Sequence, residues 1–352
     1  MTSEVAGCGS ACSRVGATAP GLNAVIRAVV HRAIKAYGWS VIGFRHGWRG
    51  LLQSEAEDLN LNTVSGILPR GGTILGTSRT NPYKEPDGEE RIRRELSGRG
   101  VDVLIVIGGE DTLGVAAKLH KAGVHLVGIP KTIDNDVNGT DYTFGFDTAL
   151  SIAMEAIDRL HTTAESHDRV IVVEVMGRNA GWIALEAGVA GGADMILIPE
   201  YPVPIDEVCD VVRRRHDRGK NFSIIVVAEG ARLRDVEGAV VQVQSERRDA
   251  FGHERLGGIG ATLAARIEER TGFESRYSVL GHIQRGGSPS AFDRFLGTRF
   301  GVAAVDLAHR EGFGRMVAIR GMKIVDVPID EALGSPKTVD RDFYELAKVF
   351  ST

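Results

Sequence analysis

The sequence has few cysteines, few aromatic residues and no long apolar run. Its 352 residues include 3 cysteines, 11 prolines and 6% aromatic residues. So few cysteines do not make the disulfide framework of a small secreted domain. No apolar stretch reaches the ~18 residues of a membrane-spanning helix, and the start of the chain has no apolar secretory core. We therefore expect a cytoplasmic protein that has no membrane partner.

Charge of either sign is also not in excess. The 42 basic and 46 acidic residues give a formal net charge of −4, which does not indicate a nucleic-acid partner. The histidines and cysteines lack the spacing of a structural metal site. A hydrophobic content of 43% and a charged content of 25% are typical of globular proteins, and the length suggests about two domains.

Apolar runs with strand character alternate with helical patterns through most of the chain. We expect strands at 101–107, 124–129, 170–175, 195–198 and 223–227, and helices at 22–36, 112–121, 150–160, 180–190 and 205–215. This alternation predicts an α/β fold in which helices cover both faces of parallel sheets. Ligands of such folds bind beyond the carboxyl ends of the strands. The 44 glycines are the one unusual count, so glycine-rich turns at those ends are the first candidate sites.

One such turn is Gly-Gly-Glu-Asp-Thr at 108–112, which closes a strand and opens a helix. Gly108 and Gly109 allow the backbone to approach a ligand closely, and a helix N-terminus offers amides to phosphate oxygens. The carboxylates of Glu110 and Asp111 can reach a Mg²⁺ carried by the phosphates. The alternative is a tight turn in which Asp111 and Thr112 only cap the helix.

The next strand ends in Pro-Lys-Thr-Ile-Asp-Asn-Asp at 130–136. Lys131 can neutralise a phosphate, while Asp134 or Asp136 can accept a proton from an attacking hydroxyl. The alternative is a polar loop capped by aspartate and asparagine. Because two adjacent strand ends carry this chemistry, the two motifs together favour a phosphate site more strongly than either does alone.

Five arginines also follow glycine-rich or strand-terminal positions: Arg79, Arg169, Arg178, Arg276 and Arg285. Arginine suits the planar recognition of phosphate oxygens. For any single one, a solvated surface pair is the alternative, but five together indicate a ligand with more than one phosphate. Glu229 ends an apolar strand and can accept hydrogen bonds from sugar hydroxyls; its alternative is an ordinary carboxylate at a strand end.

Taken in order, these motifs resemble those of the 6-phosphofructokinase family. The resemblance runs from about Pro20 to the C-terminus, through PGLNAVIRA, GGTILGTSRTNP, GGEDT, PKTIDND, AESHDR, VEVMGRNAGW, VVAEG and GHIQRGGSPS. It implies two Rossmann-like three-layer domains with largely parallel sheets and an active site in the cleft between them. Residues 1–145 plus about 284–335 would form the phosphoryl-donor domain, and about 146–283 plus 336–352 the domain that binds fructose 6-phosphate.

The resemblance also implies roles for individual residues. Asp134 matches the base that accepts the sugar hydroxyl proton, Arg79 the arginine that steadies the transferring phosphoryl group, and Glu110 the position that handles Mg²⁺. Asp136 would support the metal and the loop. Arg169 and Arg276 match arginines supplied by a neighbouring subunit, which implies a homodimer or homotetramer. The other implied sugar-phosphate contacts are Thr132, Ile133, Met176, Gly177, Arg178, Glu229, His282, Ile283, Gln284 and Arg285.

The implied donor site contains Gly108, Gly109, Asp111 and Lys131, and the last two bear on the choice of donor. ATP-using members of the family usually have glycine where this chain has Asp111, whose carboxylate would crowd and repel the α-phosphate of a nucleotide. In the family, aspartate and lysine at these two positions accompany pyrophosphate use. The resemblance therefore implies reversible transfer from pyrophosphate to the 1-hydroxyl of fructose 6-phosphate, giving fructose 1,6-bisphosphate and phosphate. An ATP-dependent enzyme is the alternative.

The resemblance fails before Pro20, where the family has a first strand and a glycine-rich phosphate loop. Residues 1–19 show no strand pattern, and Ala17 and Thr18 stand where the loop's last glycine and an aspartate are expected. If Ser10 to Pro20 are written in GC-rich codons, reading from the third base gives Arg-Val-Leu-Thr-Gly-Gly-Gly-Asp-Cys-Pro, the missing strand and loop. We predict a one-base slip near Ala19. The alternative to the slip is a divergent N-terminus. Because the loop is missing, a catalytically impaired sugar-phosphate-binding subunit is the alternative of another class for the function.

Overall fold

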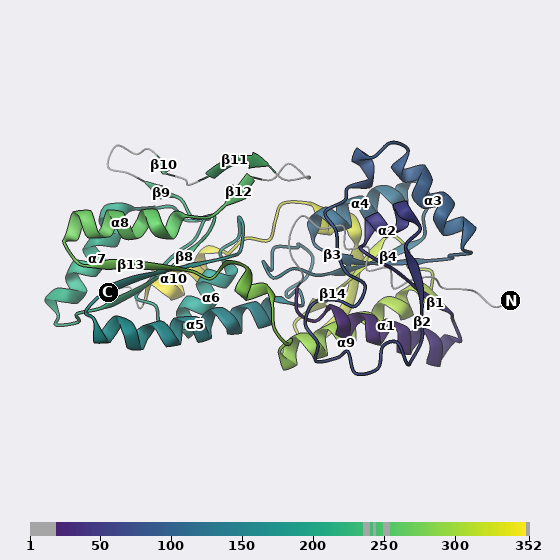
Figure 1. Cartoon of the computed structure of the whole chain (residues 1–352), viewed down its shortest axis with the longest axis horizontal. Helices are drawn as coiled ribbons and strands as arrows, with labels where there is room; N and C mark the ends of the chain where they lie inside the picture. Colours follow the sequence, from purple (N-terminus) through teal and green to yellow (C-terminus); the bar gives the residue numbers. More distant parts are fainter. Residues whose placement is uncertain (1–18, 235–239, 242–243, 249–253, 350–352) are drawn as a thin grey trace.

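A computed structural model of the chain describes residues 19–234, 240–241, 244–248 and 254–349. Two four-stranded sheets, each flanked by helices, lie at opposite ends of an elongated molecule (Figure 1). The predicted α/β class with two largely parallel, three-layer domains is confirmed. The shifted reading frame was predicted from residues that lie almost entirely outside this described part of the chain.

The first sheet has the order β15-β14-β4-β3, with only β15 antiparallel to its neighbour. Its strands are β3 (Leu104–Gly108), β4 (Leu126–Pro130), β14 (Arg315–Arg320) and β15 (Lys323–Pro328). Helices α1 (Leu22–Tyr37) and α9 (Ala291–His309) pack on one face, and α3 (Gly88–Gly98) and α4 (Glu110–Lys121) on the other.

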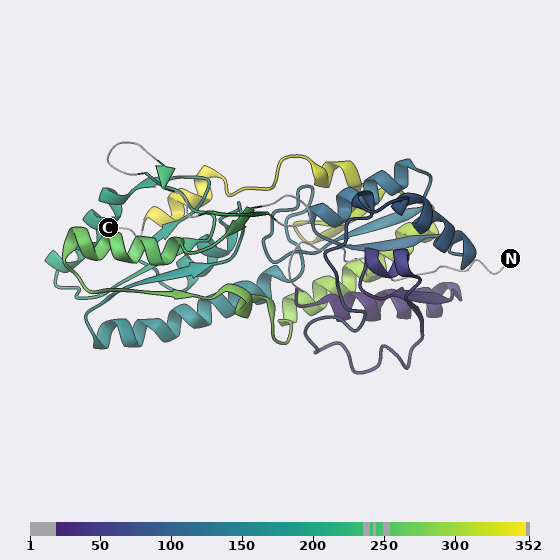
Figure 2. The same ribbon diagram turned by 45° about the horizontal axis from the view of Figure 1, so that its top comes forward.

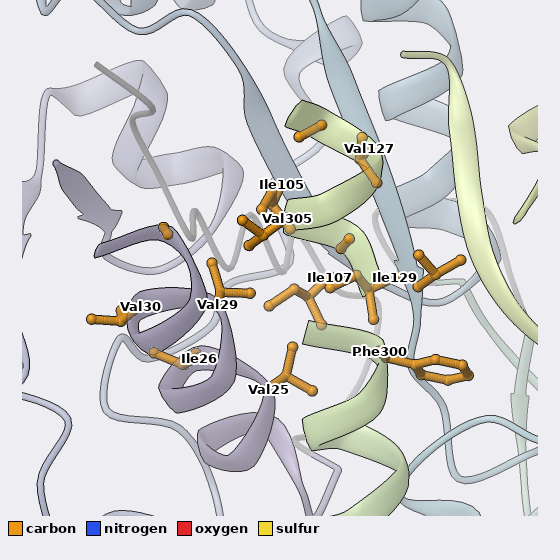
Figure 3. Close-up of a cluster of buried hydrophobic side chains, with 14 of the residues drawn as sticks. Val25, Ile26, Val29, Val30, Ile105, Ile107, Val127, Ile129, Phe300 and Val305 are labelled. Atoms are coloured by element: carbon orange, nitrogen blue, oxygen red, sulfur yellow. The ribbon is translucent and has the colours of Figure 1, made fainter. Parts of the chain in front are cut away.

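Alternation along β3 explains why its whole sequence is apolar. Ile105 and Ile107 face the core with α1 and α9, whereas Leu104 and Val106 face the core with α3 and α4. Figure 3 shows the first of these cores, where Val29 of α1 and Val305 of α9 meet Ile105 and Ile107. A strand covered on both faces needs apolar side chains at every position, which is the pattern seen in the sequence.

The second sheet, β13-β5-β8-β6, is parallel throughout. Its strands are β5 (Val170–Val175), β6 (Met195–Leu197), β8 (Ser223–Ala228) and β13 (Ser275–Val279). Helices α5 (Phe146–Ser166) and α6 (Trp182–Ala190) pack on one face, and α7 (Ile205–Asp217) and α8 (Ile259–Thr271) on the other.

Smaller elements complete the described part of the chain. The short strands are β1 (Val41–Phe44), β2 (Ala56–Leu59), β7 (Val203–Pro204), β9 (Leu233–Arg234), β10 (Val240–Val241), β11 (Gln244–Arg248) and β12 (Glu254–Leu256). The remaining helices are α2 (Trp48–Gln53), α10 (Arg341–Lys348) and the 3-10 helices η1 (Pro82–Lys84), η2 (Gly281–Arg285) and η3 (Ile329–Leu333). Within the described residues, no helix is both long and apolar enough to span a membrane.

The predicted helices and strands are all present: β5 has the predicted bounds, and the others have shifted ends. The strand expected from residue 101 begins at Leu104, and the helix expected at 150–160 extends over Phe146–Ser166. Helix α5 starts earlier than predicted because a distant residue caps it: Asp293 of α9 accepts hydrogen bonds from the Gly145 and Thr148 amides, both at 2.8 Å. Sequence periodicity carries no signal for a cap supplied by another helix.

Candidate active site

A small polar cavity lies where strands of both sheets end. It is lined from the first sheet by the turn after β3 and by the segment after β4, and from the second by Arg178 after β5 and Arg285 after β13. The lining residues are Gly109, Glu110, Asp111, Thr112, Thr132, Asp134, Asp136, Arg178 and Arg285. The two sequence motifs that predicted a phosphate site thus meet in space, and the cavity is where residues of the two sheets come together.

Asp134 is the buried acid among those that line this cavity, and it faces an arginine. Its Oδ1 lies 4.0 Å from Nη2 of Arg285, and the two side chains are 5% and 6% exposed. Thr132 Oγ1 donates to Asp134 Oδ2 at 3.2 Å and accepts from the Asp134 amide at 3.0 Å, so the carboxylate has a defined orientation. Oδ1 has no hydrogen-bond partner among the described residues, and neither do Nε and Nη1 of Arg285. These atoms can therefore serve a ligand.

Carboxylates that line the cavity or lie beside it affect one another's protonation. Burial, together with the Asp134 carboxylate, raises the pKa of Asp136 to about 7, against the opposing charge of Arg178. Burial and Asp134 likewise raise the pKa of Glu229, at the end of β8, to about 7. Such a concentration of buried acids favours the binding of cations, because a cation relieves the repulsion between them.

The loop after β5 is shaped by tight backbone contacts. A Cβ on Gly177 would lie 2.6 Å from the Ala180 carbonyl oxygen, and Gly177 has a φ of 143° that favours glycine. Arg178 adopts a left-handed φ of 54°, and its amide donates to Glu229 Oε1 at 3.1 Å. The Met176 amide donates to Oε1 of the fully buried Gln284 at 2.8 Å, while Gln284 Nε2 has no partner among the described residues. Left-handed backbone at a non-glycine residue is strained and is typical of functional loops.

The turn after β3 is equally constrained. A Cβ on Gly108 would lie 2.3 Å from the Thr112 side chain, so the first turn of α4 packs directly on the strand end. Glu110 and Asp111 occupy that first turn. Lys131 is fully buried, and its amide donates to the Gly108 carbonyl at 2.8 Å. The Lys131 backbone thus lies beside the start of α4, although Lys131 is not among the residues that line the cavity.

Several predicted site residues do not line the cavity. Ile133 is fully buried in the core with Ala19 and Phe146, so its side chain faces away from solvent. Arg79, His282 and Ile283 are exposed. Arg79 belongs to the loop containing Gly71, whose Cβ position lies 2.1 Å from the Gly287 carbonyl oxygen, and this contact brings the loop near Arg285.

Two of the five arginines lie at the amino ends of the strands of the second sheet, away from the cavity. Arg169 directly precedes β5, and Arg276 is the second residue of β13, whereas Arg178 and Arg285 follow the same two strands. At ~3.3 Å per residue, the amino and carboxyl ends of β5 are roughly 20 Å apart. Arg169 and Arg276 pair instead with Glu274, at 2.7 and 2.5 Å. Strand direction therefore separates arginines that the sequence motifs had grouped.

The structure also shows how two polar residues that are not among the predicted site residues hold the loop after β4. Asn135 has a left-handed φ of 52° and accepts from the Thr143 amide at 3.1 Å, which closes the loop after β4. Lys337 contacts the same loop from the C-terminal part of the chain. An asparagine between two aspartates is a signal for a turn. A single lysine in a polar stretch carries no such signal.

Comparison with known sequences gives close relatives. A protein of Streptomyces coelicolor named pyrophosphate–fructose 6-phosphate 1-phosphotransferase is 59% identical over 336 residues, 95% of this chain and 97% of its own. A protein of Amycolatopsis methanolica with the same name is 59% identical over 335 residues, with the same coverage. An ATP-dependent 6-phosphofructokinase of S. coelicolor is 52% identical over 333 residues, 95% of this chain and 97% of its own.

Comparison with solved structures agrees. Phosphofructokinase from Saccharomyces cerevisiae superposes with a TM-score of 0.78 at 32% identity, covering 95% of this chain and 45% of the yeast chain. A pyrophosphate-dependent phosphofructokinase from Marinobacter aquaeolei shares the fold, with a TM-score of 0.78 at 23% identity over 96% of this chain and 90% of its own. A model of the family described as phosphofructokinase matches residues 10–308. The chain therefore belongs to the phosphofructokinase family.

Proposed function

We propose that this protein transfers a phosphoryl group reversibly from pyrophosphate to the 1-hydroxyl of fructose 6-phosphate, giving fructose 1,6-bisphosphate and phosphate. The observation that carries the proposal is Asp134, a buried carboxylate with Oδ1 available to a ligand and Arg285 opposite it. A carboxylate so placed can accept the hydroxyl proton while the phosphoryl group moves. The relatives that are 59% identical and named for this reaction support it.

On the acceptor side, Asp134 is the proposed base, and the sugar phosphate binds across the ends of the second sheet. Arg178 and Arg285 would hold the phosphate, and Glu229 would accept hydrogen bonds from sugar hydroxyls. Support comes from the topology, since these residues follow the neighbouring strands β5, β13 and β8. The other proposed contacts are Thr132, the backbone of Ile133, Met176, Gly177, His282, Ile283 and Gln284.

On the donor side, Gly108, Gly109 and Lys131 would bind the donor phosphates at the start of α4. Asp111 lines the cavity in the first turn of that helix, where its carboxylate would crowd and repel the α-phosphate of a nucleotide, a group that pyrophosphate lacks. Arg79 would steady the transferring phosphoryl group, and its loop already contacts the Gly287 backbone through Gly71. The ATP-dependent relative at 52% identity is the basis of the alternative donor.

Mg²⁺ is the proposed cofactor. Glu110, Asp111, Asp134 and Asp136 line one cavity and supply the oxygen ligands that Mg²⁺ prefers. In the described residues, no three His, Cys, Asp or Glu side chains are grouped as a complete metal site. This agrees with Mg²⁺ that is bound through one or two carboxylates and the substrate phosphates. We place Glu110 as the principal ligand, with Asp136 in support; the ion would neutralise charge on the donor phosphates.

We further propose a cytoplasmic homodimer or homotetramer in which Arg169 and Arg276 enter the neighbouring subunit's sugar site. Their position at the amino ends of β5 and β13 supports this, since the cavity of their own subunit lies at the carboxyl ends of those strands. Tyr277 and Val279, on the same strand as Arg276, are 53% and 50% exposed. Apolar side chains exposed in a single chain are typical of a surface that another subunit covers. This surface is the proposed contact.

The proposed domain boundaries are those implied by the family resemblance. Residues 1–145 with about 284–335 form the donor domain, and about 146–283 with 336–352 the sugar domain. Val339 and Tyr344 support the C-terminal assignment because they pack in the same core as Ala153 and Ile183.

A donor assay tests the function. The purified chain is incubated with fructose 6-phosphate, Mg²⁺ and either pyrophosphate or ATP, and fructose 1,6-bisphosphate is measured, with sugar binding followed separately by calorimetry. Turnover with pyrophosphate supports the proposal, and turnover with ATP alone overturns the donor assignment. Binding of fructose 6-phosphate without turnover on either donor would identify an impaired binding subunit.

A further inference from the structure

The chain passes from η3 to α10 through a connecting segment that joins the two sheet units, drawn in yellow in Figures 1 and 2. In the middle of this segment, Lys337 contacts the loop after β4 three times. Its amide donates to the Asp136 carbonyl at 2.9 Å, and its Nζ donates to the carbonyls of Thr140 at 3.1 Å and Asp141 at 2.6 Å. The loop that carries Asp134 is therefore held by the backbone and side chain of Lys337, in addition to its hydrogen bonds with Ile319 and Gly321.

The same residue is anchored to the second sheet unit. Trp182 Nε1, at the start of α6, donates to the Lys337 carbonyl at 2.9 Å, and Lys337 Nζ lies 5.4 Å from the centre of the Trp182 ring. Glu200 Oε1 accepts from the amides of Val339 at 3.0 Å and Gly181 at 2.9 Å. Gly181 ends the loop that begins with Met176 and contains Arg178. The connecting segment thus joins the loop after β4 to the loop after β5.

The partners of Lys337 distinguish this arrangement from an ordinary surface ion pair. Nζ donates to two main-chain carbonyls, which fix backbone position, whereas a carboxylate partner would fix only another side chain. Burial lowers the pKa of Lys337 to about 8, and the negative charges of Asp141 and Asp136 of the loop and Glu186 of α6 oppose that shift. Displacing catalytic groups by about 1 Å can cost ~10²-fold in rate, so control of this backbone bears on turnover.

We propose that Lys337 is a positioning residue, which sets the loop carrying Asp134 against the loop carrying Arg178. The inference rests on the proposed function, because it assigns these two loops to the base and to the sugar phosphate. Lys337 is not among the residues that line the cavity.

Three variants test the inference. Lys337→Met removes the ammonium group and keeps the length of the side chain, and Lys337→Arg keeps the charge. Lys348→Met is the matched control, because Lys348 also lies over an aromatic ring, 5.1 Å from the centre of Tyr344, and pairs with Glu345, yet contacts no loop of the site. The measurements are kcat, KM for both substrates, the Kd of fructose 6-phosphate, and amide exchange.

We expect Lys337→Met to lower kcat ~10–100-fold while the Kd of fructose 6-phosphate changes less than about threefold. Lys337→Arg should recover most of the loss, and Lys348→Met should behave as wild type. Amide exchange should quicken at Asp134 and Asp141 in Lys337→Met alone. Unchanged kcat in that variant, or an equal loss in Lys337→Arg, would overturn the inference.

A substitute variant and a measurement that needs no substrate keep the inference testable. If Lys337→Met does not fold, Trp182→Phe takes its place, since it keeps an aromatic side chain and removes the indole N–H that donates to the Lys337 carbonyl, together with part of the ring's bulk. The expected kcat loss is then smaller, in the same direction, and its absence overturns the inference. Amide exchange needs no substrate, so wild type lacking pyrophosphate activity would contradict the proposed function while exchange at Asp134 and Asp141 still decides the role of Lys337.

Discussion

Asp134 and Arg285 face each other across the cavity, with Oδ1 and Nη2 4.0 Å apart and both side chains almost fully buried. Buried polar atoms without hydrogen bonds cost free energy, which a ligand recovers by supplying the missing partners. The proposed reaction makes this pair the place where the sugar substrate meets the base.

Asp134→Asn should lower kcat by ~10²–10⁴-fold, the range for loss of a positioned base. The Kd of fructose 6-phosphate should change little, because asparagine has a similar shape. Steady-state kinetics and calorimetry measure the two effects. Asp158→Asn, at an exposed position of α5, is the control. Turnover within a few-fold of wild type would remove Asp134 from the role of base.

Asp111→Gly should weaken pyrophosphate use, and ATP use should rise only if the rest of a nucleotide pocket is intact. The substitution removes a carboxylate from the first turn of α4 and so relieves steric and charge conflict with an α-phosphate. The comparison is kcat/KM for the two donors. Unchanged pyrophosphate kinetics would show that Asp111 does not discriminate between donors.

Mixing two inactive variants tests the shared site. In a mixed dimer of Asp134→Asn and Arg276→Ala, one of the two sites has both an intact base and an intact arginine from its neighbour. Random mixing should restore roughly a quarter of wild-type activity, since half the dimers are mixed and half their sites are intact. Each variant alone should stay inactive. No recovery after verified subunit exchange would place Arg276 outside the neighbouring site.

Glu186→Gln should stabilise the protein at alkaline pH. Burial, with Asp147 adding to it and Lys337 opposing, raises the pKa of Glu186 from 4.5 to about 7. The folded state thus holds a proton that the unfolded state releases, and this stability is complete below pH 4.5 and is lost as the pH rises through 7. We expect the variant to gain about 1–3 kcal/mol over wild type at pH 8 and much less at pH 5.

Denaturant titrations of Glu186→Gln and wild type at the two pH values measure this difference. Glu165→Gln, at an exposed position of the neighbouring α5, is the control and should change stability equally at both. An equal gain for Glu186→Gln at pH 5 and pH 8 would contradict the direction of the pKa shift.

A chain beginning Met-Arg-Lys-Arg-Val-Leu-Thr-Gly-Gly-Gly-Asp-Cys before Pro20 should have higher pyrophosphate-dependent activity than the present chain. Glycines in a turn after a strand let backbone amides form an anion-binding concavity. β3 is the last strand of its sheet among the described ones, so the new strand has a sheet edge to join. Sugar binding should be equal in both chains. Equal activity, or genomic codons that do not permit the shifted reading, would contradict the prediction.

Local sequence was enough to locate the chemistry of the proposed site. Strand β3 is apolar at each position from Leu104 to Ile107, and a glycine turn with acids follows it directly. The run of apolar residues and the turn that follows it are both local features of the sequence. The end of β3, after which Glu110 and Asp111 stand, was therefore predictable. The same reasoning found Asp134 after β4, and motif order indicated the family.

Tertiary structure decided which of these residues meet. Arg169 and Arg178 flank the same strand, β5. They therefore lie at opposite ends of the sheet, separated by the length of that strand. Lys337 and Asp136 are distant in sequence, and their contact exists because the chain returns across both sheet units before α10. Local periodicity along the chain was sufficient for the helices and strands and for the chemistry at their ends. Long-range packing determined the partners, because no local pattern encodes which distant segment a strand end will face.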